Sequence, residues 1–125
     1  MVKLVFVIRR REDVAPDQFH RYWLEEHAPK VRSVAKVIRA RRYVQSHAVD
    51  TPLNAALRKS RGMTGSYDGV AELWWDSLAE FKAGSSSREG VEAGRMLLED
   101  ESRFIDFARS TMFMTEEHEV FDFRD

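Results

Sequence analysis

The chain has 125 residues, a length typical of one domain, and 43% of them are hydrophobic, which is enough to fill a single core. The formal net charge is -1 with 33% charged residues, so no overall field attracts nucleic acid or an anionic membrane. The absence of cysteine excludes disulfides, thiolate metal ligands and a cysteine nucleophile. We therefore expect one domain spanning residues 1–125, with no nucleic-acid or membrane partner.

The first predicted element is a strand over Lys3 to Arg9. Both alternating sets of its side chains are apolar, which predicts a strand that is buried on both faces. The apolar run is short and leads directly into three arginines, so it is neither a signal peptide nor a membrane span. These features predict a cytoplasmic protein.

A helix with an aromatic face follows this strand. Pro16 is suited to the first helical position, and Asp17 places negative charge in the first turn. Aromatic and ionisable residues then recur at helical spacing up to His27. Pro29 disfavours helical geometry in the residue before it, so we expect a break at residues 27–29 before the helical pattern resumes.

The remaining elements alternate in type. Residues 39–49 predict a second strand, and Thr51 and Pro52 begin a short helix that Gly62 ends. Residues 70–75 predict a third strand, and Ser77 with Glu80 forms a capping box for the next helix. We expect that helix to be interrupted around residues 84–87, to resume up to about residue 104, and to precede a fourth strand at 111–116.

The order strand, helix, strand, strand, helix, strand predicts an α+β fold of the ferredoxin-like kind, a split βαβ unit with a four-stranded antiparallel sheet. Helices cover one face of such a sheet. The first strand is apolar on both faces, so the second face needs a cover that this chain has no spare element to supply. We expect a homodimer in which two sheets pack together.

The segment from Asp17 to Pro29 reads D-x-F-x-x-Y-W-x-x-x-H-x-P. This pattern resembles the first-helix signature of the ethyl tert-butyl ether degradation (EthD) family. The segments at residues 43–47, 67–75 and 113–121 are similar to further family positions. The resemblance implies a single EthD-like domain that forms a dimeric α/β barrel with a pocket in each subunit. It leaves the reaction open, since similar barrels carry many activities.

His27 is the first candidate for acid/base chemistry. It lies at the end of the aromatic helix face, where the helix terminus favours imidazolium and an apolar pocket favours the neutral ring. A pKa near the working pH suits a general acid or base. The alternative is a capping histidine whose ring only bonds a backbone carbonyl.

Tyr43, Gln45 and His47 share one face of the second strand, where their polar tips suit the oxygen of a ligand. We expect Tyr43 to be catalytic with His27, and Gln45 and His47 to bind substrate, unless the strand lies at a sheet edge with His47 solvated. Glu72 lies within an apolar strand and either binds substrate or forms an ion pair with Arg42 or another strand arginine.

Tyr22, Trp23 and Trp74 offer flat apolar walls for an aromatic ring, and we expect Trp23 and Trp74 to sandwich it; the alternative is that they only fill the core. The four histidines are scattered without ligand spacing, so we expect no metal site and no cofactor.

Two classes of function fit this pattern. The first is a cofactor-free acid/base enzyme, of the isomerase, cyclase, dehydratase or decarboxylase type, acting on a small aromatic or carbonyl-bearing metabolite. The alternatives are a non-catalytic protein that binds an apolar ligand for an oxidative degradation pathway, or a haem-linked oxidoreductase. Composition and motifs do not identify the substrate.

Overall fold

The computed structural model describes all 125 residues and contains one four-stranded antiparallel sheet. Its strands lie in the order β2-β3-β1-β4. Their bounds are Val2–Ile8 for β1, Arg42–His47 for β2, Gly69–Trp75 for β3 and Thr111–Glu116 for β4. This topology confirms the predicted α+β, ferredoxin-like fold.

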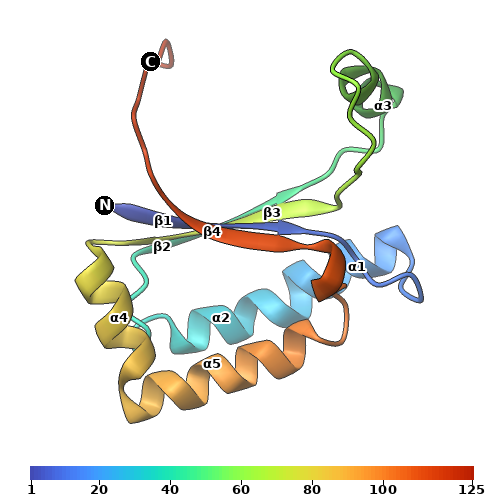
Figure 1. The fold of residues 1–125 in the computed structure, drawn as a ribbon. Coiled ribbons are helices and arrows are strands. Elements are labelled where there is room, and N and C mark those ends of the chain that lie inside the picture. The colour runs from blue at the N-terminus through green and yellow to red at the C-terminus, as the bar shows by residue number, and fades with distance from the viewer.

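One face of the sheet is covered by helices (Figure 1). These are α1 (Pro16–Tyr22), η1 (Trp23–His27), α2 (Ala28–Val34), α4 (Leu78–Ser86) and α5 (Arg88–Glu101), followed by the short 3-10 helix η2 (Phe107–Arg109). Helix α3 (Pro52–Lys59) and the C-terminal tail instead rise on the opposite side of the sheet. No helix has the length and hydrophobicity needed to cross a membrane.

The helix break expected at residues 27–29 is absent. Residues Trp23–His27 form one π-helical turn, and the backbone N–H of Ala28 bonds to the carbonyl of Trp23 five residues earlier. This wider turn leads directly into α2, whose first turn contains Pro29. A proline in a first helical turn costs little because its missing N–H would find no partner there, so the helix continues without a gap.

Two further boundaries differ from the sequence-based expectation. The second strand begins at Arg42 rather than residue 39, because Arg39 has a left-handed φ of 63° that a strand cannot contain. The helical interruption expected around residues 84–87 is present, but it lies at Ser87, whose extended backbone separates α4 from α5, and α4 continues through Gly84 to Ser86. An added Cβ at Gly84 would lie 2.1 Å from the carbonyl oxygen of Ile38, so this glycine permits close packing and does not interrupt the helix.

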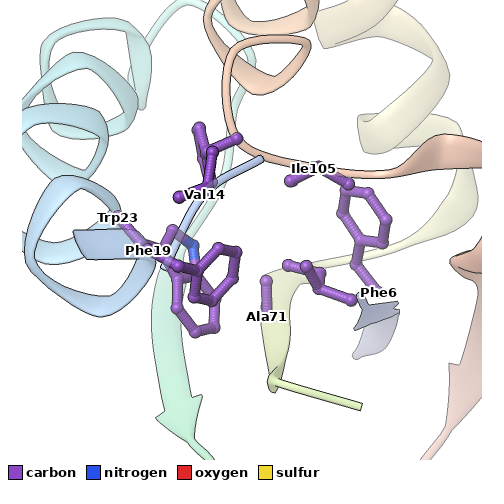
Figure 2. Close-up of a cluster of buried hydrophobic side chains, with 8 residues drawn as sticks. Phe6, Val14, Phe19, Trp23, Ala71 and Ile105 are labelled. Carbon is purple, nitrogen blue, oxygen red and sulfur yellow. The ribbon is translucent and has the colours of Figure 1, made fainter. Parts of the chain in front are cut away.

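The core lies between the helices and the sheet, as Figure 2 shows. Phe19 and Trp23 from the helix layer face Phe6 and Ala71 from the sheet, with Ile105 closing the cluster. Burial of these side chains fixes the sheet register, since a shift by one residue would turn them to the other face.

The other sheet face has no helix layer in this subunit. The register aligns Val5 with Glu72 and Phe113, and Glu72 with Val44, so these four side chains share that face. Phe113 is 53% exposed. We call this surface, made by the outward residues of the four strands, the open sheet face.

Candidate functional site

A small cavity of about 50 Å³ lies between the helix layer and the sheet. His27 of η1, Tyr43 of β2 and Glu101 of α5 line it, together with Trp23 and other apolar side chains. A second compartment of about 180 Å³ shares four wall residues with it, namely Phe6, Leu73, Leu97 and Glu101. We refer to the two compartments together as the inner cavity.

His27 is buried and hydrogen-bonded on the side away from the inner cavity. Its Nδ1 lies 2.6 Å from an oxygen of Asp100, which is also buried. Burial lowers the pKa of His27, and the hydrogen bond to Asp100 and its charge partly oppose that effect. The ring is therefore mainly neutral near pH 7. Because an ionised carboxylate only accepts, Nδ1 carries the proton and Nε2 is left as a base.

Asp100 holds its charge through three hydrogen bonds. Besides His27, the Tyr22 hydroxyl donates to it at 2.5 Å and the Lys30 ammonium at 2.6 Å. Burial by itself raises the pKa of Asp100, but the bonds from Lys30, Tyr22 and His27 outweigh burial and lower the pKa to about 2. The carboxylate therefore stays ionised at all ordinary pH values and orients the His27 ring.

Glu101 is the second ionisable group of the inner cavity. Its carboxylate lies 3.9 Å from Nε2 of His27, beyond hydrogen-bond distance. Burial, followed by the neighbouring charge of Asp100, raises the pKa of Glu101 to about 7. A neutral base and a carboxylic acid thus face the same space, and such a pair is suited to moving a proton.

Sequence reasoning missed both Asp100 and Glu101. The signal was present, because α5 carries apolar side chains at positions such as Ala93, Leu97 and, beyond its end, Phe104, and the two carboxylates fall within this stripe. A carboxylate on the apolar face of a helix needs a partner or a raised pKa. Glu101 has the raised pKa, and Asp100 has the partners.

Tyr43, Gln45 and His47 form a hydrogen-bonded row along β2. The Gln45 amide nitrogen lies 2.7 Å from the Tyr43 hydroxyl, and its oxygen lies 2.7 Å from Nε2 of His47. His47 also contacts His20 of α1 and stacks on Trp23 with a centroid distance of 4.5 Å. Of the three β2 residues only Tyr43 lines the inner cavity, whereas Gln45 and His47 are not among its lining residues.

Trp74 and Glu72 are not part of this site. They lie on the open sheet face, opposite Leu73 and Ala71, so the expected sandwich of a ring between Trp23 and Trp74 is wrong. The alternation of side chains along a strand separates the two tryptophans by the thickness of the sheet. Trp74 packs against Lys3 and Arg42.

Glu72 pairs with a lysine and not with the expected strand arginine. Its carboxylate lies 2.7 Å from the Lys3 ammonium. The hydroxyl of Tyr22 donates a hydrogen bond to Asp100, and Tyr22 does not line the inner cavity. No group of three or more His, Cys, Asp or Glu side chains has the arrangement of a metal site.

Comparisons with known proteins agree with this architecture. The model of the EthD domain matches residues 11–108. No protein among those with curated descriptions matches. Among solved structures, an EthD family protein of Bacillus halodurans has 21% identity and a TM-score of 0.63, covering 94% of this chain and 99% of that one.

Two other solved structures are more distant in sequence. A dimeric ferredoxin-like protein of unknown function from Thermobifida fusca has 14% identity and a TM-score of 0.58, with 91% of this chain and 88% of that chain covered. SnoaB, a cofactor-independent oxygenase from Streptomyces nogalater, has 13% identity and a TM-score of 0.56, with 95% and 94% covered. At these identities the likeness concerns the fold.

Proposed function

This chain belongs to the EthD family, and on that premise we propose that it is a cofactor-free enzyme that moves a proton on a small, apolar, carbonyl-bearing molecule. The observation that carries the proposal is the Asp100–His27 pair beside Glu101 in the wall of a mostly apolar cavity. The family and fold are compatible with small-molecule binding or catalysis. Among these functions, the ionisable side chains of the site favour acid/base catalysis.

The proposed step is an enolisation. His27 Nε2 takes a proton from the carbon beside the carbonyl, the electrons of the broken C–H bond form the carbon–carbon double bond, and the carbonyl oxygen takes up the charge. Asp100 stabilises the resulting imidazolium, and the Tyr43 hydroxyl is suited to the oxygen. Where the enolate is conjugated with a further double bond, protonated Glu101 can donate a proton to the far carbon, and the imidazolium then passes its proton to the Glu101 carboxylate, which restores both groups and completes an isomerisation.

SnoaB supports the cofactor-free part of the proposal, since its description as a cofactor-independent oxygenase concerns a protein of the same fold. The haem alternative has less support. The space beside His27 Nε2 is about 50 Å³ and is bounded by the Glu101 carboxylate, which leaves no room for a four-pyrrole macrocycle next to that nitrogen.

Hydrogen exchange into a model ketone tests the proposal. 2-Tetralone is a neutral aromatic ketone with acidic C–H groups, and its exchange in D₂O is followed by NMR. The protein should accelerate exchange, and His27→Gln should reduce the accelerated rate by about 10²- to 10⁴-fold, the usual contribution of a general base. Glutamine keeps a polar tip of similar reach and removes the titrating nitrogen.

His118→Gln is the matched control, because His118 is exposed and lies after β4, outside the cavity lining. It should exchange 2-tetralone at the parent rate. Binding of 2-tetralone without any acceleration of exchange would contradict catalysis and favour a non-catalytic ligand-binding protein.

We also propose that the open sheet face is covered by a second copy of the chain. Val5, Val44 and Phe113 place apolar surface there, and no helix of the same subunit covers it. Two such faces packed together would bury this surface as in a sheet-on-sheet core. The similar protein from Thermobifida fusca is described as dimeric, which supports the proposal.

A further inference from the structure

The orientation of the Gln45 side chain is fixed by a backbone carbonyl. Its Nε2 lies 2.9 Å from the carbonyl oxygen of Trp23 and 2.7 Å from the hydroxyl oxygen of Tyr43. A carbonyl oxygen can only accept, so the amide nitrogen must face Trp23. The two amide hydrogens are then both used, one on Trp23 and one on Tyr43.

The fixed amide also fixes the protonation of His47. The Gln45 oxygen faces Nε2 of His47 at 2.7 Å, and because that oxygen only accepts, Nε2 must carry a hydrogen. In the neutral ring Nδ1 is then an acceptor. It lies 2.9 Å from Nδ1 of His20, which donates to it. Stacking on Trp23 holds the His47 ring in this position.

The fixed orientation of the Gln45 amide determines the hydrogen bonding of Tyr43, which lines the inner cavity. Its oxygen accepts from Gln45, so the hydroxyl proton is not used in that bond. Burial raises the pKa of Tyr43, with smaller opposing contributions from Gln45 and Trp23, and the hydroxyl therefore keeps its proton. Tyr43 lines the cavity that His27 and Glu101 share. No cationic side chain lines either compartment of that cavity.

We propose that Gln45 and His47 are positioning residues that hold the Tyr43 hydroxyl as a hydrogen-bond donor into the inner cavity. The cavity then selects uncharged, apolar ligands that carry an acceptor oxygen, and it disfavours carboxylates and phosphates because no cation faces them. The inference rests on the proposed function only in placing the ligand in the same cavity. Gln45 and His47 thus orient Tyr43 and do not contact the ligand, in contrast to the ligand contacts expected from the sequence.

The first test compares two probes of the same shape, 2-tetralone and tetralin, which lacks the oxygen. Their affinities are measured by calorimetry or NMR titration. The ratio of the affinity for 2-tetralone to the affinity for tetralin should be roughly 3- to 10-fold higher in the parent than in Tyr43→Phe. That factor is the effect of one hydrogen bond. Gln45→Glu keeps the size but replaces the donor by acceptors, so the Tyr43 hydroxyl turns toward residue 45 and the preference falls to that of Tyr43→Phe.

His47 is tested with two replacements. His47→Phe keeps an aromatic ring against Trp23 and removes the N–H donor, and it should lower the preference for 2-tetralone. His47→Gln restores a donor of similar reach and should recover most of that loss. His118→Gln should leave the preference at the parent value. A parent-like preference in both Gln45→Glu and His47→Phe would overturn the proposal.

A second measurement needs no variant and no ligand. Long-range ¹H–¹⁵N NMR of the parent protein reports which ring nitrogen of each histidine carries the proton. Neutral His47 should be the Nε2–H tautomer, and the Nδ1–H tautomer would overturn the inference. This outcome is separate from the fate of the proposed function, which depends on exchange of 2-tetralone and on His27.

Discussion

The Nδ1 atom of His27 lies 2.6 Å from a carboxylate oxygen of Asp100, although 73 positions separate the two residues in the chain. Asp100→Asn removes the charge that supports imidazolium, so the pKa of His27 should fall further below its usual value. NMR titration of the His27 ring measures it. An unchanged or higher pKa in the variant would show that the carboxylate does not act on the ring.

The same substitution should also lower stability. The asparagine side chain of this variant cannot satisfy the Lys30 ammonium and Tyr22 hydroxyl as the carboxylate does, so we expect a loss of about 1–3 kcal/mol in chemical denaturation at pH 7. In the parent, the stabilisation from Asp100 should be lost as the pH falls from 3.8 towards 2, because the folded pKa is the lower one. Asp17→Asn, on an exposed position of α1, serves as the control.

The contribution of Glu101 to stability should depend on pH in the opposite direction to that of Asp100. The folded protein keeps this proton up to about pH 7, whereas the usual pKa of a free glutamate side chain is 4.5, so the unfolding free energy should fall as the pH rises between those values. Glu101→Gln removes that cost and should stabilise the protein by roughly 1–3 kcal/mol at pH 8, and by less at pH 5. Thermal or chemical unfolding at the two pH values measures the difference. An equal gain from the exposed Glu99→Gln would assign the effect to general surface charge.

The exchange reaction should have a bell-shaped pH profile. His27 must be neutral to act as a base, and its lowered pKa, with burial as the main cause, places the rising limb below the usual histidine value of 6.5. Ionised Glu101 would place a negative charge beside the developing enolate and so disfavour enolisation, which places the falling limb near pH 7. The two limbs belong to the coupled pair. Initial rates of 2-tetralone exchange between pH 5 and 9 test this, and a rate that only rises across the range would show that the ionisation of Glu101 does not affect enolisation.

Trp74 should matter for stability and not for ligand binding. Its side chain is 6% exposed, so Trp74→Ala should cost about 3–5 kcal/mol because a large ring leaves a cavity. Since Trp74 lies on the open sheet face, the variant should bind 2-tetralone with the parent affinity at a temperature where it is folded. A variant that is stable but has lost binding would place Trp74 against the ligand.

Phe113 tests the homodimer. It lies on the open sheet face and is 53% exposed in the single subunit. Light scattering should give a dimer mass for the parent at micromolar concentration, and Phe113→Asp should give a monomer because the carboxylate would be buried between two sheets. Leu98→Asp changes an exposed apolar residue on the outer side of α5 and should remain dimeric. A monomer mass for the parent would contradict the proposal that a second copy of the chain covers the open sheet face.

Local patterns were sufficient for most of the secondary structure. The capping serine of α4 illustrates this, because Ser77 Oγ accepts from the backbone N–H of Glu80 at 3.1 Å, as the capping box predicts. Thr51 caps α3 in a similar way. Caps and strand alternation depend on residues close in sequence, and the order of the elements was then enough to predict the ferredoxin-like topology. At Pro29, by contrast, the local rule failed, because a π-helical turn supplied a bonding pattern in which the missing N–H is not needed.

The site depended on tertiary structure. The sequence alone identified His27, Tyr43 and Trp23, all of which line the inner cavity. It could not decide which sheet face the cavity occupies, and so it grouped Trp74 with Trp23. Nor could it bring α5 against η1, the contact that places Asp100 and Glu101 on either side of the His27 ring. The physical reason is that hydrophobic patterning is non-directional and assigns a residue to a buried face, whereas a hydrogen-bonded ionisable pair requires atoms from distant segments to meet within about 3 Å, which only the packed chain determines.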